Sequence, residues 1–435
     1  MASTYLSRTP VSAGNRQTWT WSGWVKRGSL GDYYVLFVAG SPNTWIRFTN
    51  TDKLEVFVQD DFQFDVITNQ VFRDTSAWYH IVVAVDTTQA SQSDRIKIYV
   101  NGDLVDLTIT YLVQNYNTGI NNTSTHYFGR LNYVSVQYFD GIIAHTHLID
   151  GTQYSASDFG ETDATTGIWK PKTAPSVTYG TNGFFLKFEN SGAFGTDSSG
   201  NGNNFTVNGT MTQTIDTPSN VFATLNPLNK ADLTYAYGNN QITNNTTSHN
   251  GTQATLAVNK GKWYWETKYI DGTATKSMAG ISIVTETIGN NLVGGTANSY
   301  GYYRSNGQKY NNGSGTAYGT TPSNGSIIGI AFDADNGTIW FSLDGVWQNS
   351  ATISEIENGV TTNSAFSGIS MSDYYAPACS AENCSTQVNF GNGYFGTTAV
   401  ASAQNPDDGI GIFEYSVPTG YKALCTKSIN AQEYS

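Results

Sequence analysis

Apolar and polar residues alternate along most of the chain, in short segments separated by Gly, Asn, Asp and Pro. In the N-terminal half these segments include TWTWSGWVKRG (18–28), YYVLFVAG (33–40), WIRFTN (45–50) and KLEVFVQ (53–59). Alternation with period 2 is typical of strands with one buried face, and this close spacing is typical of antiparallel sandwiches and jelly rolls. No convincing stretch of eleven or more residues follows the helical period. The pattern therefore predicts an all-β protein.

Two of the predicted hairpins share the same turn chemistry. IKIYVNGDL (96–104) contains Asn101-Gly102, and IWFSLDGVW (339–347) contains Asp344-Gly345. Such pairs suit turns that need positive φ at both central residues. We therefore interpret Asp344 as a turn residue rather than a catalytic acid.

The chain is too long for one compact core. At 435 residues it predicts at least two domains, and IDTPSNVFATLNPLNKADL (215–233) has the composition of a connector. We predict a first β-sandwich at 1–221, a second at 222–404 and a short C-terminal coda at 405–435. The second half repeats the strand pattern without repeating the sequence, for example in SIIGIAFDADNGTIWFSLDGVW (326–347).

The charge of the chain excludes some classes of partner. Only 13% of residues are charged, and 22 basic against 34 acidic residues give a net charge of −12. No basic cluster longer than VKR (25–27) is present, which argues against nucleic-acid binding. No apolar run approaches the roughly 20 residues that span a bilayer, so we predict no membrane insertion.

Two family resemblances follow from the motifs. WYHIVVAVD (78–86), IKIYVNGDL, YFGRLN (127–132) and FDGIIAHTHLIDG (139–151) resemble the laminin-G-like branch of the concanavalin A-like jelly rolls over about residues 15 to 155. GKWYWE (261–266), GYYRSNGQKY (301–310), IIGIAFDADNGTIWFSLDG (327–345) and VNFG (388–391) resemble a SPRY domain over about residues 235 to 396. The SPRY resemblance implies a bent two-sheet sandwich that binds partners through loops at one edge and is not an enzyme.

The whole tandem is similar to structural proteins predicted in genomes of marine tailed bacteriophages. TLNPL (224–228) and GYKALCT (420–426) carry this third resemblance. It implies a virion surface protein, either a tail-fibre or appendage adhesin that binds host glycan or protein, or a capsid decoration or head-fibre protein. The implied partners are other virion proteins and a host surface ligand, with many copies or a homo-oligomer on each particle.

Enzyme motifs are weak in this sequence. A glucanase of the jelly-roll type needs carboxylates at alternate positions of one strand, and no Glu-x-Asp-x-Glu triplet occurs. No Gly-x-Ser-x-Gly elbow is present either. A glycan-degrading hydrolase remains the less favoured alternative, and we predict no catalytic residues.

Metal binding has two weak candidates. His145 and His147 alternate on one predicted strand and could offer two ligands, but no third ligand is identifiable. DSSGNGN (197–203) offers oxygen ligands for calcium through Asp197 and Asn201, although in relatives a similar motif precedes the strand run. The alternative for this loop is a surface turn stabilised by its own side chains.

Tyrosine-rich loops are the remaining functional signal. SYGYYRSNGQKYNNGSGTAYG (299–319) combines Tyr with Gly, Asn and Ser, a composition that antibody loops use for binding. Tyrosines that simply fill the sandwich would give the same pattern. The candidate ligand-binding residues are Tyr302, Tyr303, Arg304, Tyr310, Tyr374 and Tyr375.

Overall fold

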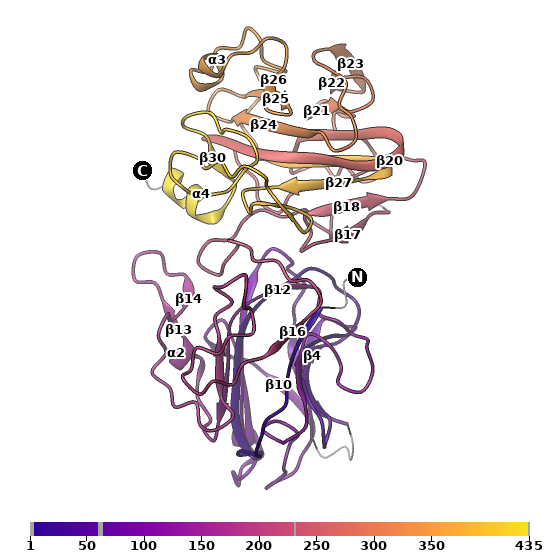
Figure 1. Ribbon diagram of the computed structural model, residues 1–435. Helices are drawn as coiled ribbons and strands as arrows, with labels where there is room; N and C mark the ends of the chain where they lie inside the picture. The colour runs from indigo at the N-terminus through magenta and orange to yellow at the C-terminus, as the bar shows by residue number, and fades with distance from the viewer. Residues whose placement is uncertain (1–3, 60–63, 230–231, 434–435) are drawn as a thin grey trace. The chain divides into compact units, whose positions relative to one another are not determined.

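The computed structural model describes residues 4–59, 64–229 and 232–433, with the side chains of 271–275 excepted. The chain forms two compact units, residues 1–213 and 214–435 (Figure 1). The division falls eight residues before the predicted start of the second domain at 222. Each unit has its own hydrophobic core, and each is described separately below.

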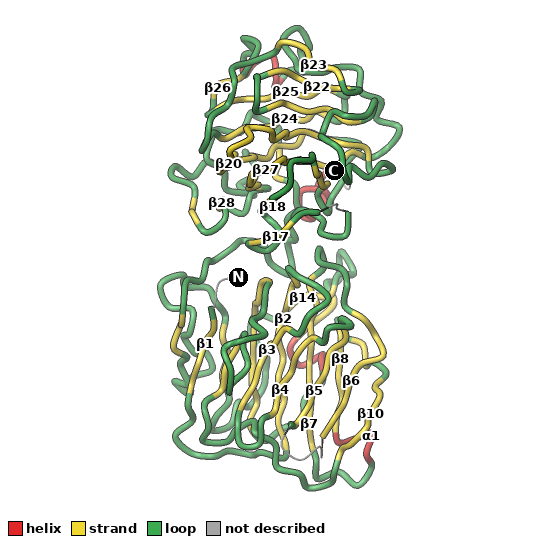
Figure 2. The backbone as a smooth tube through the Cα atoms, turned by 90° about the vertical axis from the view of Figure 1, so that its right-hand side faces the viewer, coloured by secondary structure: helices red, strands yellow, loops and turns green. Residues whose placement is uncertain are grey.

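The first unit is a sandwich of two antiparallel sheets, whose neighbouring strands lie side by side in Figure 2. In spatial order, the first sheet contains β10 (Leu107–Leu112), β6 (Phe64–Val71), β5 (Lys53–Val58), β4 (Thr44–Phe48), β3 (Tyr34–Ala39), β11 (His126–Phe128), β1 (Tyr5–Arg8) and β16 (Thr206–Asn208). The second contains β15 (Phe184–Leu186), β12 (Gly141–Asp150), β2 (Thr18–Arg27), β7 (Trp78–Asp86), β8 (Ile96–Val100) and β9 (Asp103–Leu104).

Smaller elements accompany these sheets. They are the helical turns α1 (Gln92–Arg95) and α2 (Ala156–Phe159) and the hairpin of β13 (Gly160–Thr162) and β14 (Trp169–Pro171).

Alternation along the strands builds the core of the first unit. In β5, Leu54, Val56 and Val58 are buried between the sheets, whereas the side chains between them point outward and stay partly exposed. Burial of apolar side chains at every second position is the main source of stability for such a sandwich. The outward positions are therefore the ones available for binding.

The second unit is built around one long strand, β20 (Lys262–Ile283). Its first part pairs with β24 (Ile327–Asp333), its later part pairs with β21 (Ser299–Tyr303), and β27 (Tyr375–Asn389) pairs with most of its length. Register shifts on either side of Gly272 interrupt the pairing with β27, as expected for a strand that bends. The two parts of β20 thus pair with different strands on either side of the bend.

The other strands extend this sheet. They are β17 (Thr234–Ala236), β18 (Gln241–Asn244), β19 (Asn250–Gln253), β22 (Gln308–Asn311), β23 (Ser314–Ala317), β25 (Thr338–Leu343), β26 (Val346–Trp347) and β30 (Lys422–Ala423). A separate hairpin joins β28 (Tyr394–Phe395) and β29 (Thr398–Ala399), and the helices are α3 (Ile353–Glu357) and α4 (Thr426–Glu433). Prediction of two antiparallel β-sandwich units in tandem is therefore confirmed.

The predicted coda at 405–435 is an integral part of the second unit. Strand β30 pairs in parallel with β20, and Phe413, Tyr421 and Cys425 are buried in a cluster with Trp340. The alternation in this segment is too short to reveal such packing from the sequence.

Both predicted hairpin turns adopt the expected backbone. The φ angles are +51° at Asn101 and +98° at Gly102, and +48° at Asp344 and +81° at Gly345. The Asp344 carboxylate also accepts the N–H of Ile327 at 2.8 Å. Asp344 is therefore a turn residue, as predicted.

Candidate binding site

Three of the six predicted ligand residues lie in the core of the second unit. The Tyr302 ring is buried and stacks on Phe341, with ring centroids 5.5 Å apart. Arg304 is also buried, and its guanidinium carbon lies 5.4 Å from the centroid of the Tyr269 ring. Tyr375 is only 1% exposed. We therefore correct the prediction: these side chains fill the sandwich and are not surface contacts.

Strand alternation explains this outcome. Tyr302 and Tyr303 are neighbours on β21, and neighbouring side chains on a strand point to opposite faces. Tyr303 is partly exposed on the outer face, and Tyr374 is 52% exposed next to the buried Tyr375. In each pair one tyrosine is a core residue and the other faces outward.

Tyr303 and Tyr310 meet on the outer face. Strand β21 pairs with β22 so that Gly301 lies opposite Tyr310, which makes Tyr303 its diagonal neighbour. The two rings are 5.1 Å apart at an interplanar angle of 77°. This edge-to-face contact fixes two amphipathic side chains in one place.

A charged group that the sequence did not reveal adjoins these rings. Lys276 on β20 lies opposite Glu382 on β27, and its Nζ is 2.7 Å from the Glu382 carboxylate. His249, just before β19, places its Nε2 3.2 Å from the same carboxylate and its ring 6.4 Å from that of Tyr303. We call His249, Lys276, Tyr303, Tyr310 and Glu382 the tyrosine cluster.

Protonation states follow from this geometry. Burial lowers the pKa of His249, and the Glu382 carboxylate offsets part of that effect. The hydrogen bond that Lys276 donates to Glu382 raises the pKa of Lys276, and burial raises the pKa of Tyr303. Near neutral pH the cluster therefore offers a neutral imidazole, an ion pair and a neutral phenol at Tyr303.

A shallow hollow continues the same surface. Its cavity volume of 10 Å³ leaves room for about one water molecule, so it suits surface recognition rather than enclosure of a substrate. Ile288 and Leu292 in its wall pack in the same apolar cluster as Tyr303 and Tyr310. The lining residues are Ser282, Glu286, Thr287, Ile288, Asn291, Leu292, Thr296 and Ser299.

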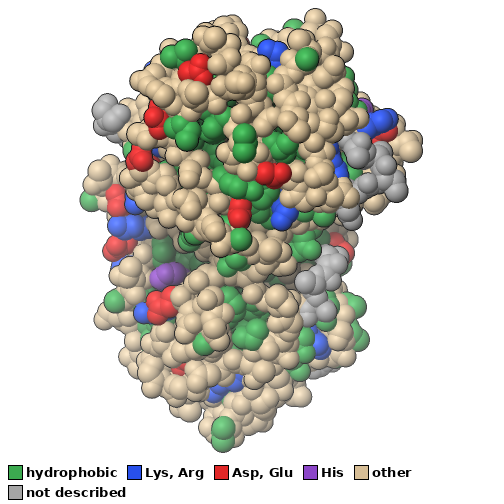
Figure 3. Space-filling model, turned by 45° about the horizontal axis from the view of Figure 1, so that its top comes forward, with side chains coloured by type: hydrophobic (Ala, Val, Ile, Leu, Met, Phe, Trp, Pro, Cys, Tyr) green, Lys and Arg blue, Asp and Glu red, His purple; other side chains and the backbone are tan. Residues whose placement is uncertain are grey.

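Charged side chains are sparse on the face of the molecule seen in Figure 3. Figure 3 shows a face on which acidic and basic side chains are scattered among backbone and uncharged groups. This agrees with the low charged fraction of the sequence, 13%. Recognition of a ligand by aromatic rings and neutral hydrogen-bonding groups fits this surface better than attraction of a charged ligand by a strong electrostatic field.

The calcium candidates form a closed hydrogen-bonded turn. Both oxygens of Asp197 accept hydrogen bonds, from the N–H groups of Ser199 and Asn203 in the loop and from that of Phe185 on β15. The Asn201 amide donates to backbone carbonyls instead of presenting its oxygen to a shared centre. These contacts favour the alternative of a self-stabilised turn.

The histidine pair does not form the predicted arrangement. A register shift between Ala144 and His147 interrupts the alternation, and His145 has φ of +43°. His147 is buried, with its Nδ1 3.0 Å from the hydroxyl of Tyr179. Among the described residues, no group of three or more His, Cys, Asp or Glu side chains is placed to hold a metal ion.

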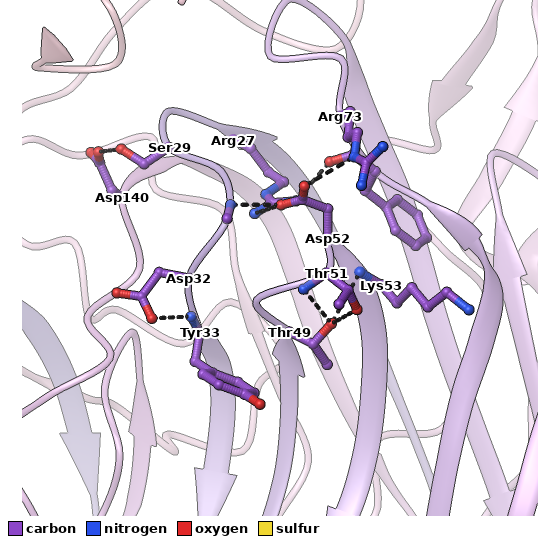
Figure 4. Close-up of polar contacts among 12 residues, drawn as sticks. Arg27, Ser29, Asp32, Tyr33, Thr49, Thr51, Asp52, Lys53, Arg73 and Asp140 are labelled. Atoms are coloured by element: carbon purple, nitrogen blue, oxygen red, sulfur yellow. Dashed lines mark hydrogen bonds and ion pairs between the residues drawn. The ribbon is translucent and has the colours of Figure 1, made fainter. Parts of the chain in front are cut away.

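The first unit contains a buried ion-pair network around Asp52 (Figure 4). One carboxylate oxygen lies 3.1 Å from Arg27 Nη2 and accepts the N–H of Gly31, and the other lies 3.1 Å from Arg73 Nε. Asp52 and Arg27 are both buried. Because Arg27, Asp52 and Arg73 are distant in sequence, no local motif predicts that they meet. We interpret the network as structural.

Two family models match the chain. Residues 2–157 match the concanavalin A-like lectin/glucanases superfamily, and residues 262–393 match the SPRY domain. The chain therefore carries a concanavalin A-like domain followed by a SPRY domain, as the sequence motifs predicted. The tyrosine cluster belongs to the SPRY part, except for His249, which precedes the matched range.

Several solved structures are similar to parts of the chain. They include the SPRY domain of human HERC1 (16% identity, covering 38% of this chain and 96% of that chain, TM-score 0.30) and a human SPRY domain (14%, 37%, 95%, 0.28). A heptameric SAP-like pentraxin from Limulus polyphemus also matches (12%, 35%, 71%, 0.27). At these TM-scores the matches add nothing to the domain assignment. A search of curated proteins finds no match.

The helices in the described ranges are too short or too polar to cross a membrane.

Proposed function

We propose that this protein is a non-enzymatic adhesin on the surface of a tailed-phage particle, where it binds a host surface glycan or protein. The observation that carries the binding role is the tyrosine cluster. Two fixed rings, an ion pair and an imidazole lie together on an outward sheet face beside a shallow hollow. Tyr rings supply large contact area at low cost in conformational entropy.

The particle setting is supported by the sequence resemblance to predicted phage structural proteins. In that setting the partners are other virion proteins, and the protein is present in many copies or as a homo-oligomer. Display in many copies allows weak single contacts to add up to firm attachment. A shallow surface site fits this mode of binding.

The binding role is tested with soluble protein and host cells. We expect the wild-type protein to bind the cells and to compete with the phage for infection, and the double substitution Tyr303→Ala and Tyr310→Ala to remove both effects. Tyr111→Ala is the matched control, because Tyr111 is an exposed tyrosine of the first unit. Unchanged cell binding by the folded double variant would contradict the proposed site.

The position on the particle separates the adhesin from its closest alternative, a capsid decoration or head-fibre protein. Labelling the C-terminus in purified virions would locate the protein by electron microscopy. Label at the tail tip supports the adhesin. Label spread over the head, at tens to hundreds of copies, would assign the decoration role instead.

The hydrolase alternative rests on two carboxylates in the first unit. In the register of β5 and β6, Phe57 lies opposite Asp65 and Glu55 opposite Ile67, so Glu55 and Asp65 are diagonal neighbours. Burial raises the pKa of Asp65, and the charge of Glu55 adds to this effect. Release of reducing sugar from host polysaccharide, abolished by Asp65→Asn, would overturn the non-enzymatic proposal.

A further inference from the structure

Arg130 in the first unit lies in the notch between two tyrosine rings. Its guanidinium carbon is 4.6 Å from the centroid of Tyr5 and 4.9 Å from that of Tyr127. A third ring, Tyr138, lies 6.5 Å from Tyr5. All four side chains are partly exposed.

The sheet register puts these rings on the outer face. Strand β1 pairs with β11 so that Leu6 lies opposite Phe128 and Ser7 opposite Tyr127. Leu6 and Phe128 are buried in the core, so Tyr127 projects outward, and so does Tyr5, two residues before Ser7. The cluster is therefore part of the sheet and not of a loose loop.

A tight turn places Arg130 over this face. Gly129 has φ of +81°, and its carbonyl accepts the N–H of Phe139, which closes the following loop. The Nε of Arg130 donates to the carbonyl of Leu131 at 2.8 Å. Stacking and this hydrogen bond together fix the plane of the guanidinium.

In the part of the chain that the structure describes, the outer edge of this guanidinium has no partner. Within the ranges that the structure describes, Nη1 and Nη2 of Arg130 form no hydrogen bond or ion pair, and neither do the hydroxyls of Tyr5, Tyr127 and Tyr138. A fixed guanidinium edge is a preferred site for a planar carboxylate.

In two other places of the same unit, an arginine that contacts two aromatic rings also pairs with a carboxylate. Arg47 lies 4.4 Å from the centroids of both Tyr33 and Trp45, and its Nε donates to the Glu55 carboxylate at 2.6 Å. Arg27 likewise contacts two aromatic rings, and its Nη2 pairs with a carboxylate, that of Asp52. Arg130 has the rings without the carboxylate.

We propose that Arg130, Tyr5, Tyr127 and Tyr138 form a binding site for a carboxylate-bearing sugar of an acidic polysaccharide. The guanidinium edge holds the carboxylate, the unpaired phenol hydroxyls bind sugar hydroxyls, and the ring faces cover its C–H surface. A chain with a net charge of −12 repels anionic polymers as a whole, so a local cation is needed for this recognition. Three rings with free hydroxyls favour a sugar over the carboxylate of a peptide.

The test uses the full chain and isothermal titration with an oligosaccharide of galacturonate and its carboxyl-reduced, neutral counterpart. We expect the charged form to bind and the neutral form to bind about tenfold more weakly or worse. Arg130→Met should cause the same loss, and Arg130→Lys a partial loss, because lysine keeps the charge without the planar edge. Lys53→Met, which removes a cation elsewhere on the same sheet, should change nothing.

Several results would overturn this site. They are absence of binding by the wild type, equal binding of the neutral form, unchanged binding by Arg130→Met, and equally good competition by an oligoglutamate peptide. The double variant Tyr303→Ala and Tyr310→Ala should keep its affinity for the galacturonate oligosaccharide, so that failure here is separable from failure of the adhesin proposal. A loss of this affinity in the double variant would show that the oligosaccharide binds to the second unit, and would also contradict the proposed site at Arg130.

Discussion

At the scale of single residues, Glu266 is a fully buried and extensively hydrogen-bonded ionisable group of the second unit. It has no exposed surface, and its carboxylate accepts the N–H groups of Glu414 and Tyr415 at 2.9 Å each. The amide of Asn389 and the hydroxyl of Tyr264 also bond to it at 3.2 Å. Glu266 thereby fixes the C-terminal segment to β20. Burial raises its pKa to about 7, although these hydrogen bonds oppose the shift.

This pKa predicts a pH-dependent stability. Because the pKa in the folded state lies above the ordinary value of 4.5, the folded state binds the proton more tightly than the unfolded state. The contribution is complete below about pH 4.5 and is lost as the pH rises through about 7. We expect the free energy of unfolding to fall by roughly 1–3 kcal/mol between about pH 5 and about pH 8.

Urea unfolding of wild type and Glu266→Gln across this range measures the effect. The glutamine variant cannot ionise, so its unfolding free energy should lack this part of the pH dependence. It should be less stable than wild type at low pH, because its NH₂ group faces backbone donors. Parallel pH profiles for the two proteins would show that Glu266 does not titrate in this way.

At the scale of elements, hairpin turns set how strands meet in both units. Gly345 follows Asp344 between β25 and β26, and a Cβ added there would lie 2.6 Å from the Tyr415 ring. Gly325 has a similar φ, +83°, but nothing lies within 4 Å of its added Cβ. Both glycines have positive φ, but only at Gly345 would a side chain also collide with a neighbour. Comparing Gly325 with Gly345 therefore distinguishes the cost of an unfavourable φ from the cost of a steric clash.

Alanine substitutions at these two positions should differ in cost. We expect Gly325→Ala to lower the free energy of unfolding by about 1 kcal/mol, because positive φ disfavours a Cβ. Gly345→Ala should cost roughly 2–3 kcal/mol, since it adds a clash with Tyr415. Urea unfolding compares the two variants, and equal losses would contradict the steric part.

At the scale of the whole molecule, each unit has its own core and its own polar anchor. Asp52 and Arg27 form a buried ion pair in the first unit, and Glu266 holds the last segment in the second. Removing one partner of a buried pair leaves an uncompensated charge. Perturbation of such an anchor is therefore expected to act on the unit that contains it.

Expression of 1–213 and 214–435 as separate chains tests this view. We expect both to fold, and Asp52→Asn to destabilise the first by about 3 kcal/mol in urea unfolding monitored by circular dichroism. Asp32→Asn is the matched control, because Asp32 lies close to this network, in the loop before β3, but is exposed. Among the described residues its carboxylate accepts one hydrogen bond, from the N–H of Tyr33 (Figure 4). An unfolded 1–213 or 214–435 fragment, or equal effects of the two substitutions, would contradict the prediction.

The candidate site could be predicted only in part. Tyr303 and Tyr310 stand in a tyrosine-rich segment that was expected to form loops but forms strands β21 and β22, and its composition was enough to select them. The same composition also selected Tyr302, Arg304 and Tyr375, which are buried. In a run of aromatic residues, composition alone does not show which side chains point into the core. His249, Lys276 and Glu382 gave no signal, since they come from separate parts of the chain and meet only through strand pairing.

The sequence by itself determined the all-β class, the two sandwich units and the two turns, because period-2 alternation and Asn-Gly or Asp-Gly pairs act through local backbone geometry. The tertiary structure alone decided which tyrosines face outward, how residues 405–433 join the second unit, and which arginines find a carboxylate. These features depend on contacts between residues far apart in the chain. Local preferences carry no information about such contacts until register and sheet order bring the residues together.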